Sequence, residues 1–396
     1  MPAYQDLFRA PEFKPLLLSS TAHLAAQTVA GLALATLVHR ATGSPLLTAT
    51  SMFAPSLAQV VGATFLLSAS DRLPPRRTLT ALSLAFAATT AALAVPGLPI
   101  PVLFLVVLAQ GLVAAAGGGV RWGLLTEIVP KSAYITGRSL FNMSAGLTQI
   151  TGYATAGALV TVLTPHQVLL LSTALHLTAA ATAHTGLTAR APRATGRPSP
   201  SATWRTNTLL WSSRPRRLTY LGLWLPNGLI VGCEALYIPY APDAAGLLLA
   251  CAALGMLIGD ITVGRLLAPA ARARLATPLL LLLATPYLVF PLHPPLPVAA
   301  ACVTLASTGF GATLIQQERL MSLTPPDLAG HALGLHSAGM LTLQGLSATL
   351  SGTLAQLTTP TTAMAALALT SLTTTTALAM AARQDRHRAS ATPLSD

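Results

Sequence analysis

The chain has few charged residues for its length. Asp, Glu, Lys and Arg make up 9% of its 396 residues, whereas soluble domains contain about 25%. The hydrophobic fraction is 53% and the mean hydropathy is +0.62. Apolar residues also come in long uninterrupted runs instead of the narrow stripes of a surface helix. This composition excludes an ordinary soluble protein and indicates an integral membrane protein that crosses the bilayer many times.

Cysteine and the common catalytic motifs are scarce or absent. Cys233, Cys251 and Cys302 lie inside apolar runs, and no Cys-x-x-Cys spacing is present. Neither a disulfide framework nor a zinc site is therefore predicted. The sequence also lacks a Walker loop, a dinucleotide fingerprint, a His-Glu-x-x-His motif and a serine elbow. We expect no enzyme activity, no metal and no cofactor.

Twelve apolar runs are long enough to form membrane-spanning helices, which need about 20 residues each. The first run is longer than a signal-peptide core, so we expect it to be retained. The sequence predicts an all-α integral membrane fold with 12 transmembrane helices. The expected spans are 16–38, 46–69, 78–96, 101–125, 139–163, 167–187, 218–240, 244–263, 276–292, 298–317, 331–357 and 361–382.

The cations are distributed unevenly between the loops. The chain has 23 Lys and Arg against 11 Asp and Glu, a net charge of +12. With the N-terminus inside, 21 of these 23 cations fall in inner loops, Arg40 falls outside, and Arg121 lies in the fourth span. This asymmetry follows the positive-inside rule and predicts that both termini are cytoplasmic. Because the cations lie between spans, we expect a lipid bilayer as partner and no nucleic acid.

The longest loop divides the chain into halves. Residues 188–217 are rich in Arg, Pro, Ser and Thr and contain seven Arg but no acid. We interpret them as a basic cytoplasmic linker between six-helix bundles at 1–187 and 218–396, the second ending in a short cytoplasmic tail.

Glycines recur at an offset of 193 residues, which predicts equivalent helix contacts in both halves. The pairs are Gly62 and Gly255, Gly118 and Gly311, Gly137 and Gly330, Gly146 and Gly339, and Gly152 and Gly345.

The loop after the second span contains the most specific local motif. It runs from Leu67 to Arg77 and reads Leu-Ser-Ala-Ser-Asp-Arg-Leu-Pro-Pro-Arg-Arg. Together with the six-plus-six organisation, it resembles the major facilitator superfamily, which usually has Gly-x-x-x-Asp-Arg-x-Gly-Arg-Arg here. Leu67 stands in place of the first glycine, and two prolines with one extra residue replace the second. The segment from Gly123 to Pro130 is similar to drug-efflux-type members.

The resemblance implies two bundles that rock about a central site and a cluster of charges that gates the inner side. That gate would consist of Asp71, Arg72, Arg76, Arg121 and Glu127. Ordinary placement of cations at the membrane interface is the alternative interpretation of these charges.

Acidic residues inside spans are costly and are therefore candidates for proton coupling. Glu234 lies in the seventh span, and Asn227 precedes it by seven residues, which returns to within about 20° of the same helix face. Glu234 either carries a coupled proton or is a neutral carboxyl bonded to a neighbouring span. Asp260 is the second proton-coupling candidate.

Uncharged polar residues in the spans are candidates for a substrate cavity. His23 and Gln27 are four residues apart in the first span and project together near its middle. Gln149 and Gln344 lie near the middle of the fifth and eleventh spans, and with Asn227 they complete this set. Hydrogen bonds between helices are the alternative role for these side chains.

These observations predict a proton-coupled secondary transporter of a small organic compound, and the resemblance implies that the compound is exported. The alternatives are an importer of a sugar or other metabolite, which the 5% aromatic content disfavours, and a non-transporting membrane sensor or enzyme. The proton gradient replaces any cofactor, and no obligate protein partner is indicated. The 21 Arg against two Lys indicate a GC-rich bacterial source, and hence a multi-pass protein of a bacterial cell membrane.

Overall fold

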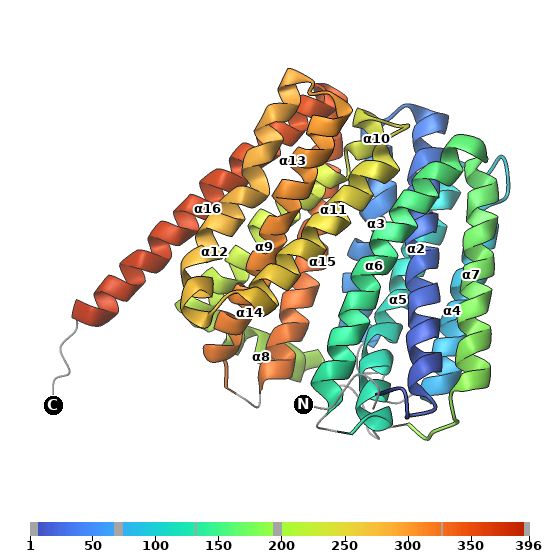
Figure 1. The fold of residues 1–396 in the computed structure, drawn as a ribbon, viewed down its shortest axis with the longest axis horizontal. Coiled ribbons are helices and arrows are strands. Elements are labelled where there is room, and N and C mark those ends of the chain that lie inside the picture. Colours follow the sequence, from blue (N-terminus) through green and yellow to red (C-terminus); the bar gives the residue numbers. More distant parts are fainter. Residues whose placement is uncertain (1–6, 67–73, 131–132, 193–199, 326–327, 392–396) are drawn as a thin grey trace. The chain divides into compact units, whose positions relative to one another are not determined.

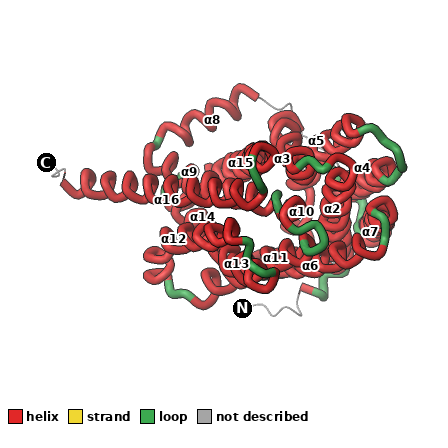
Figure 2. The backbone as a smooth tube through the Cα atoms, turned by 90° about the horizontal axis from the view of Figure 1, so that it is seen from above, coloured by secondary structure: helices red, strands yellow, loops and turns green. Residues whose placement is uncertain are grey.

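The computed structural model describes residues 7–66, 74–130, 133–192, 200–325 and 328–391. Within these ranges the regular secondary structure is entirely helical (Figure 2). The chain divides into two compact units. The first comprises Met1–Pro198 and Tyr237–Ala253, and the second comprises Ser199–Leu236 and Leu254–Asp396.

The first unit contains six long helices from the N-terminal half of the chain (Figure 1). A proline in the first turn begins several of them, where its missing N–H leaves no intrahelical bond unmade. Thr164 and Gln167 form a capping box at the start of the sixth helix. Gly43 ends the first helix at a φ of 62°, which glycine adopts without strain. The helices are α2 (Phe13–Thr42), α3 (Pro45–Leu66), α4 (Pro75–Leu93), α5 (Ile100–Ile128), α6 (Tyr134–Val162) and α7 (Pro165–Gly186).

The helices of the second half are interrupted more often. Short segments η3 (Thr262–Leu266), η4 (Thr285–Leu292) and η5 (Gly309–Gly311) extend or join α-helices. Pro286 and Pro291 lie in η4, and each lacks the N–H that a continuous α-helix would use. The remaining elements are α8 (Pro200–Ser212), α9 (Arg214–Glu234), α10 (Tyr237–Tyr240), α11 (Ala245–Ile261), α12 (Pro269–Ala284), α13 (Leu296–Thr308), α14 (Ala312–Ser322), α15 (Ala329–Leu357) and α16 (Pro360–Ala391).

The predicted spans coincide with these helices, which confirms the all-α membrane fold. Where a span contains a break, two or three elements share it: α9 with α10, α11 with η3, α12 with η4, and α13 with η5 and α14. In the described part of the chain, seven helical segments are long and apolar enough to cross a bilayer by length and composition alone. They are Phe13–Thr42, Pro165–Gly186, Arg214–Tyr240, Ala245–Leu266, Arg274–Leu292, Leu296–Ser322 and Pro360–Gln384.

The linker predicted at 188–217 is not an uninterrupted loop. Its second part forms α8, and α9 begins within it at Arg214. Trp211 at the end of α8 stacks on Trp224 of α9, with ring centroids 5.5 Å apart and an interplanar angle of 11°. This aromatic contact fixes α8 against the start of the next span.

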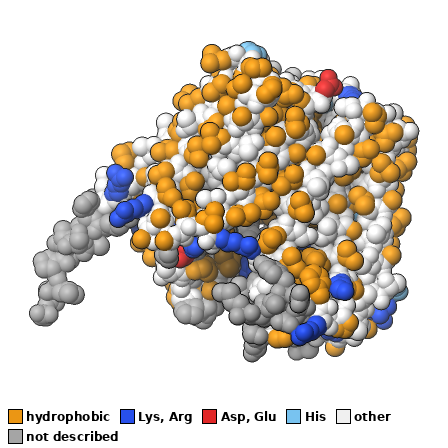
Figure 3. Space-filling view, in the orientation of Figure 1, with side chains coloured by type: hydrophobic (Ala, Val, Ile, Leu, Met, Phe, Trp, Pro, Cys, Tyr) orange, Lys and Arg blue, Asp and Glu red, His pale blue; other side chains and the backbone are white. Residues whose placement is uncertain are grey.

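Hydrophobic side chains cover much of the helix surface. The face seen in Figure 3 is dominated by them, with few charged groups between. Leu105 and Leu147 are 66% and 59% exposed on α5 and α6. Large exposed apolar residues on long helices would destabilise a protein in water, but they suit contact with lipid chains.

The same pattern of helix packing occurs in both units. In the first, α2 packs against α6 and α7, and α4 packs against α7. In the second, α9 packs against α15 and α16, and α12 packs against α16. Each helix corresponds to its counterpart by order along its half of the chain, so the two sets of contacts are those expected of a repeat.

Small residues allow the closest helix contacts. A Cβ added to Gly255 of α11 would overlap the carbonyl oxygen of Thr304 and lie 2.7 Å from Cβ of Ser307. Only a residue without a side chain allows the α11 and α13 backbones to approach this closely. By contrast, Gly334 of α15 has no atom within 4 Å of the equivalent position.

One charged cluster joins the start of α2, the end of α5 and the first part of the linker. Arg190 donates from Nη1 to Glu12 Oε2 at 2.6 Å and from Nη2 to Oε1 at 2.8 Å. Its Nε lies 3.4 Å from Oε2 of Glu127. Thr188 donates to Glu12 from its backbone N–H and its hydroxyl. The hydrogen bonds from Arg190 are the main reason that the pKa of the Glu12 carboxyl lies below its usual range.

We expect Gly255→Ala to lower the Tm of the purified protein in detergent, because overpacking a close contact costs about 1–3 kcal/mol. Gly334→Ala is the matched control, and its Tm should equal or slightly exceed that of the wild type because alanine favours helix. Equal Tm values for the two variants would contradict the close α11–α13 contact.

Glu12 should contribute a pH-dependent part of the stability. Because its pKa is lowered on folding, the contribution is complete above the unfolded value of about 4.3 and is lost as the pH falls through the lower folded value. Glu12→Gln should cost about 1.5–3 kcal/mol at neutral pH and flatten the acid side of the profile of Tm against pH. Asp243→Asn, at an exposed loop position, is the control. A profile unchanged by Glu12→Gln would show that the cluster is not stabilising.

Candidate functional site

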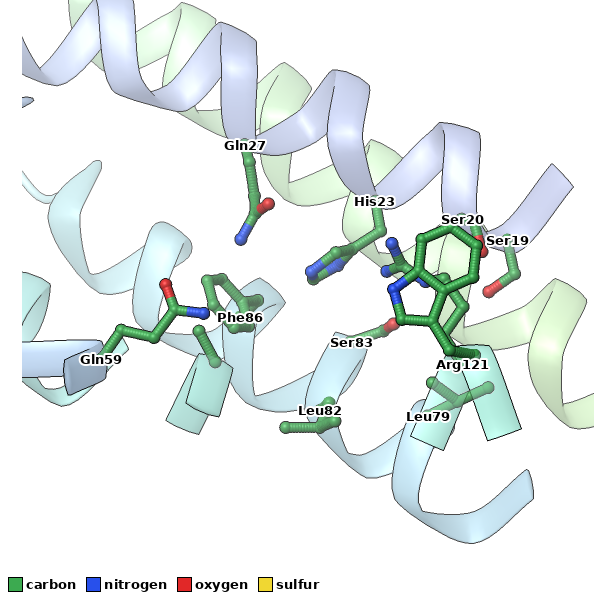
Figure 4. A pocket seen from close by; sticks show the side chains of 12 residues that line it. Ser19, Ser20, His23, Gln27, Gln59, Leu79, Leu82, Ser83, Phe86 and Arg121 are labelled. Carbon is green, nitrogen blue, oxygen red and sulfur yellow. The ribbon is translucent and has the colours of Figure 1, made fainter. Parts of the chain in front are cut away.

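A polar cavity of about 200 Å³ lies inside the first unit. Its walls come from α2, α3, α4 and α5, which are held together by the packing of α2 and α4 on α7 and of α3 on α5. Figure 4 shows the side chains of His23 and Arg121 pointing into the same end of it, with Gln27 and Gln59 toward the other. The polar lining consists of Ser19, Ser20, His23, Gln27, Gln59, Ser83 and Arg121.

Two buried polar atoms of this lining have no hydrogen-bond partner among the described residues. Nδ1 of His23 and Nε of Arg121 are buried, and neither bonds to any residue that the structure describes. Ser19 is already engaged, because its hydroxyl donates to the carbonyl of Ala179 at 2.9 Å. Buried polar groups normally find a partner, so these two atoms mark a place where a ligand or water completes the hydrogen bonding.

A second cavity of about 200 Å³ adjoins the first and shares Gln27, Gln59 and Phe86 with it. Its other walls include Leu34, Met52, Leu93 and Val107, so it is more apolar. Gln110 lies in its lining and donates from Nε2 to the hydroxyls of Thr89 and Thr90 at 2.9 and 3.2 Å. The two adjoining cavities therefore differ in character: the first is polar and the second is less polar.

Three aromatic rings pack together beside the two cavities: Phe86 lines both, His23 lines the first and His176 lines the second. The ring centroids of His23 and Phe86 are 5.0 Å apart, those of His23 and His176 are 5.0 Å apart, and those of Phe86 and His176 are 5.3 Å apart. His176 on α7 is completely buried, and neither ring nitrogen bonds to a described residue. His176, Gln59 and Gln110 are not among the cavity residues predicted from the sequence, although each is a polar residue within a predicted span.

The second unit contains the predicted carboxylate of the seventh span. Glu234 is 8% exposed at the end of α9, and its Oε1 has no partner among the described residues. Asn227 is also buried, and its Nδ2 donates to the carbonyl of Leu223 at 2.7 Å and to Oγ1 of Thr313 at 3.2 Å. The amide nitrogen therefore bonds within its own helix and to α14, whereas Oδ1 of Asn227 and Oε1 of Glu234 bond to no described residue.

The other predicted polar residues differ in their surroundings. Gln149 of α6 and Gln344 of α15 are half-buried, and neither lines the two cavities described above. Asp260 is exposed at the end of α11, next to the π segment η3.

The predicted gate residues lie only partly in the described structure. Asp71 and Arg72 fall outside the described residues. Arg76 is half-buried in the first turn of α4, and Glu127 lies against Arg190 of the linker. Arg121 lies in the polar cavity with His23.

In the described part of the chain, no group of three or more His, Cys, Asp or Glu side chains could hold a metal ion.

Comparisons with known proteins agree with this architecture. The family profile described as Major Facilitator Superfamily matches residues 16–242. The comparison with curated proteins found no matching sequence.

Solved structures of transporters share the fold at low sequence identity. A POT family transporter in complex with a thioalcohol conjugated peptide has a TM-score of 0.76 at 10% identity, over 94% of this chain and 96% of that one. The nucleoside transporter NupG has a TM-score of 0.76 at 11% identity, over 93% and 99% of the two chains. A bacterial homolog of the human lysosomal transporter Spinster has a TM-score of 0.68 at 13% identity, over 94% and 96%. The family profile matches more than half of the chain's length, and the chain therefore belongs to the Major Facilitator Superfamily.

Proposed function

We propose that this membrane transporter couples the export of a small organic compound to the inward movement of protons. The observation that carries the proposal is the pair of adjoining cavities in the first unit, where polar groups that bond to no described residue lie within membrane-spanning helices. Polar groups in such positions are costly unless a ligand, an ion or water uses them. The sequence has no nucleotide-binding motif, so an ion gradient is the proposed energy source.

Glu234 is the proposed proton carrier. It is a buried carboxyl with an oxygen that bonds to no described residue, so gaining or losing a proton would not break an existing bond. Asp260, at the exposed end of α11, is the second candidate. Asn227, Gln149 and Gln344 are proposed as further substrate contacts, together with His23 and Gln27.

The proposed orientation places both termini in the cytoplasm of a bacterial cell. It is supported by the cation asymmetry of the loops and by the large apolar surface of the helices. In this proposal residues 1–187 and 218–396 form two bundles that move relative to each other, and 188–217 joins them on the inner side. The inner gate of Asp71, Arg72, Arg76 and Glu127 remains part of it. A cysteine at position 205 that reacts with an impermeant reagent added outside intact cells would contradict this orientation.

Everted membrane vesicles test the coupled transport directly. With an imposed proton gradient read by a pH-sensitive dye, addition of a transported compound should release protons from the wild-type vesicles. We suggest a panel of hydrophobic cations, neutral amides and small carboxylates as probes. Glu234→Gln keeps the side-chain shape but cannot ionise, so it should abolish proton release and leave gradient-independent exchange of the same compound intact.

Asp243→Asn, which removes an exposed carboxylate, is the matched control and should behave like the wild type. Full proton release by Glu234→Gln would remove Glu234 from the coupling step and make Asp260 the residue to test. Uptake by wild-type vesicles without any proton movement would contradict proton coupling itself.

A further inference from the structure

Among the residues that the structure describes, the permanent cation of the polar cavity has no counterion. Arg121 enters it from α5, and no acidic side chain lines the cavity in the part of the chain that the structure describes. The nearby acid Glu127 lies six residues further along α5 and is next to Arg190 instead. Burial of a guanidinium without a partner is strongly unfavourable. Arg121 is therefore placed where an anion would stabilise it.

Donors other than Arg121 face the same space. His23 contributes an imidazole whose Nδ1 bonds to no described residue, and the buried hydroxyls of Ser20 and Ser83 also line the cavity. His23 is held in place by ring contacts with Phe86 and His176 at 5.0 Å. A guanidinium fork with hydroxyl and imidazole donors around it is the arrangement that recognises a planar oxyanion.

The size and charge of the cavity indicate which oxyanion fits. A volume of about 200 Å³ is below the roughly 300–1,000 Å³ typical of pockets for drug-sized ligands. It therefore accommodates an anionic head group, and the adjoining cavity lined by Leu34, Leu93 and Val107 accommodates an apolar remainder. Arg121 is the only Arg or Lys among the described lining residues, and one cation balances one negative charge. A carboxylate carries one charge, whereas a phosphate monoester carries close to two at neutral pH.

We propose that Arg121 binds the carboxylate of the transported compound, with His23, Ser20 and Ser83 as neighbouring donors, and that the substrate is a small organic acid with an apolar body. This inference rests on the proposed transport function and specifies its substrate class. It gives Arg121 a substrate contact in place of the gating role inferred from the sequence.

Binding to the purified full-length protein in detergent tests this inference without any gradient. The probes are benzoate and 3-phenylpropionate at neutral pH, where both are ionised, with benzamide and 3-phenylpropanamide as uncharged matches of similar shape. Sodium chloride holds the ionic strength constant, and sodium phosphate is a separate probe. The carboxylates should raise the Tm of the wild type with increasing concentration, and the amides and phosphate should not.

Variants of Arg121 identify the group responsible. Arg121→Gln should weaken carboxylate binding by about 10- to 100-fold, the effect of losing charge-assisted hydrogen bonds. Its Tm without ligand should equal or exceed that of the wild type, because the substitution removes an unpaired buried charge. Arg121→Lys keeps the positive charge but loses the paired N–H donors of the guanidinium. Its affinity for the carboxylates should therefore lie between those of the wild type and Arg121→Gln. Lys14→Gln removes an exposed cation from α2 and should bind like the wild type.

Four results would overturn the inference: no carboxylate raises the wild-type Tm, the amides act as strongly as the acids, phosphate alone is effective, or Arg121→Gln binds normally. If Arg121→Gln does not fold, the comparison of Arg121→Lys with the wild type decides in its place. The vesicle assay separates this inference from the proposed function. Proton-coupled transport of neutral compounds only would refute the proposed substrate class and leave proton coupling intact. Carboxylate binding without transport would support the binding site and refute the proposed transport function.

Discussion

A charged or strongly polar side chain in a membrane-spanning helix is tolerated only where protein, water or a ligand surrounds it, and this constraint organises the molecule. An Arg at the centre of a span costs about 2.5–3.5 kcal/mol on insertion scales. The chain meets the constraint by having few such residues, with most of its cations between the spans. Several of the polar residues that remain inside the spans gather where helices meet. In the first unit, helices α2 to α5 turn His23, Gln27, Gln59 and Arg121 toward one cavity.

The helical fold could be predicted from the sequence because lipid leaves the backbone little choice. All backbone groups of a span must be bonded internally, so an apolar run of sufficient length becomes a helix. Within the described residues, the expected ranges accordingly coincide with helices, and the breaks at η3, η4 and η5 leave the spans in place; positions 67–69 of the second range lie outside the described residues. The four-residue spacing of His23 and Gln27 also predicted correctly that they share a helix face, since both line the same cavity.

The surroundings of the polar groups could not be predicted, because they depend on which helices pack together. His176 lies 153 residues from His23 along the chain, yet their rings are in contact. The resemblance implied a gate in which Glu127 lies with charges of the loop after the second span, and in the structure Arg190 of the linker lies beside Glu127. Helix α8 was also missed, because a segment rich in Arg, Pro, Ser and Thr is typical of a loop, and its aromatic contacts with α9 depend on tertiary packing.

The central claim is that the polar cavity of the first unit holds the transported compound. Its most direct test is the rate at which a thiol reagent modifies Ser83→Cys, in a variant whose three native cysteines are replaced, with and without a compound that the vesicles transport. The account predicts that the compound slows modification at position 83 and leaves the rate at Asp243→Cys, an exposed loop position, unchanged. Equal rates at position 83 with and without a saturating concentration of the compound would contradict it.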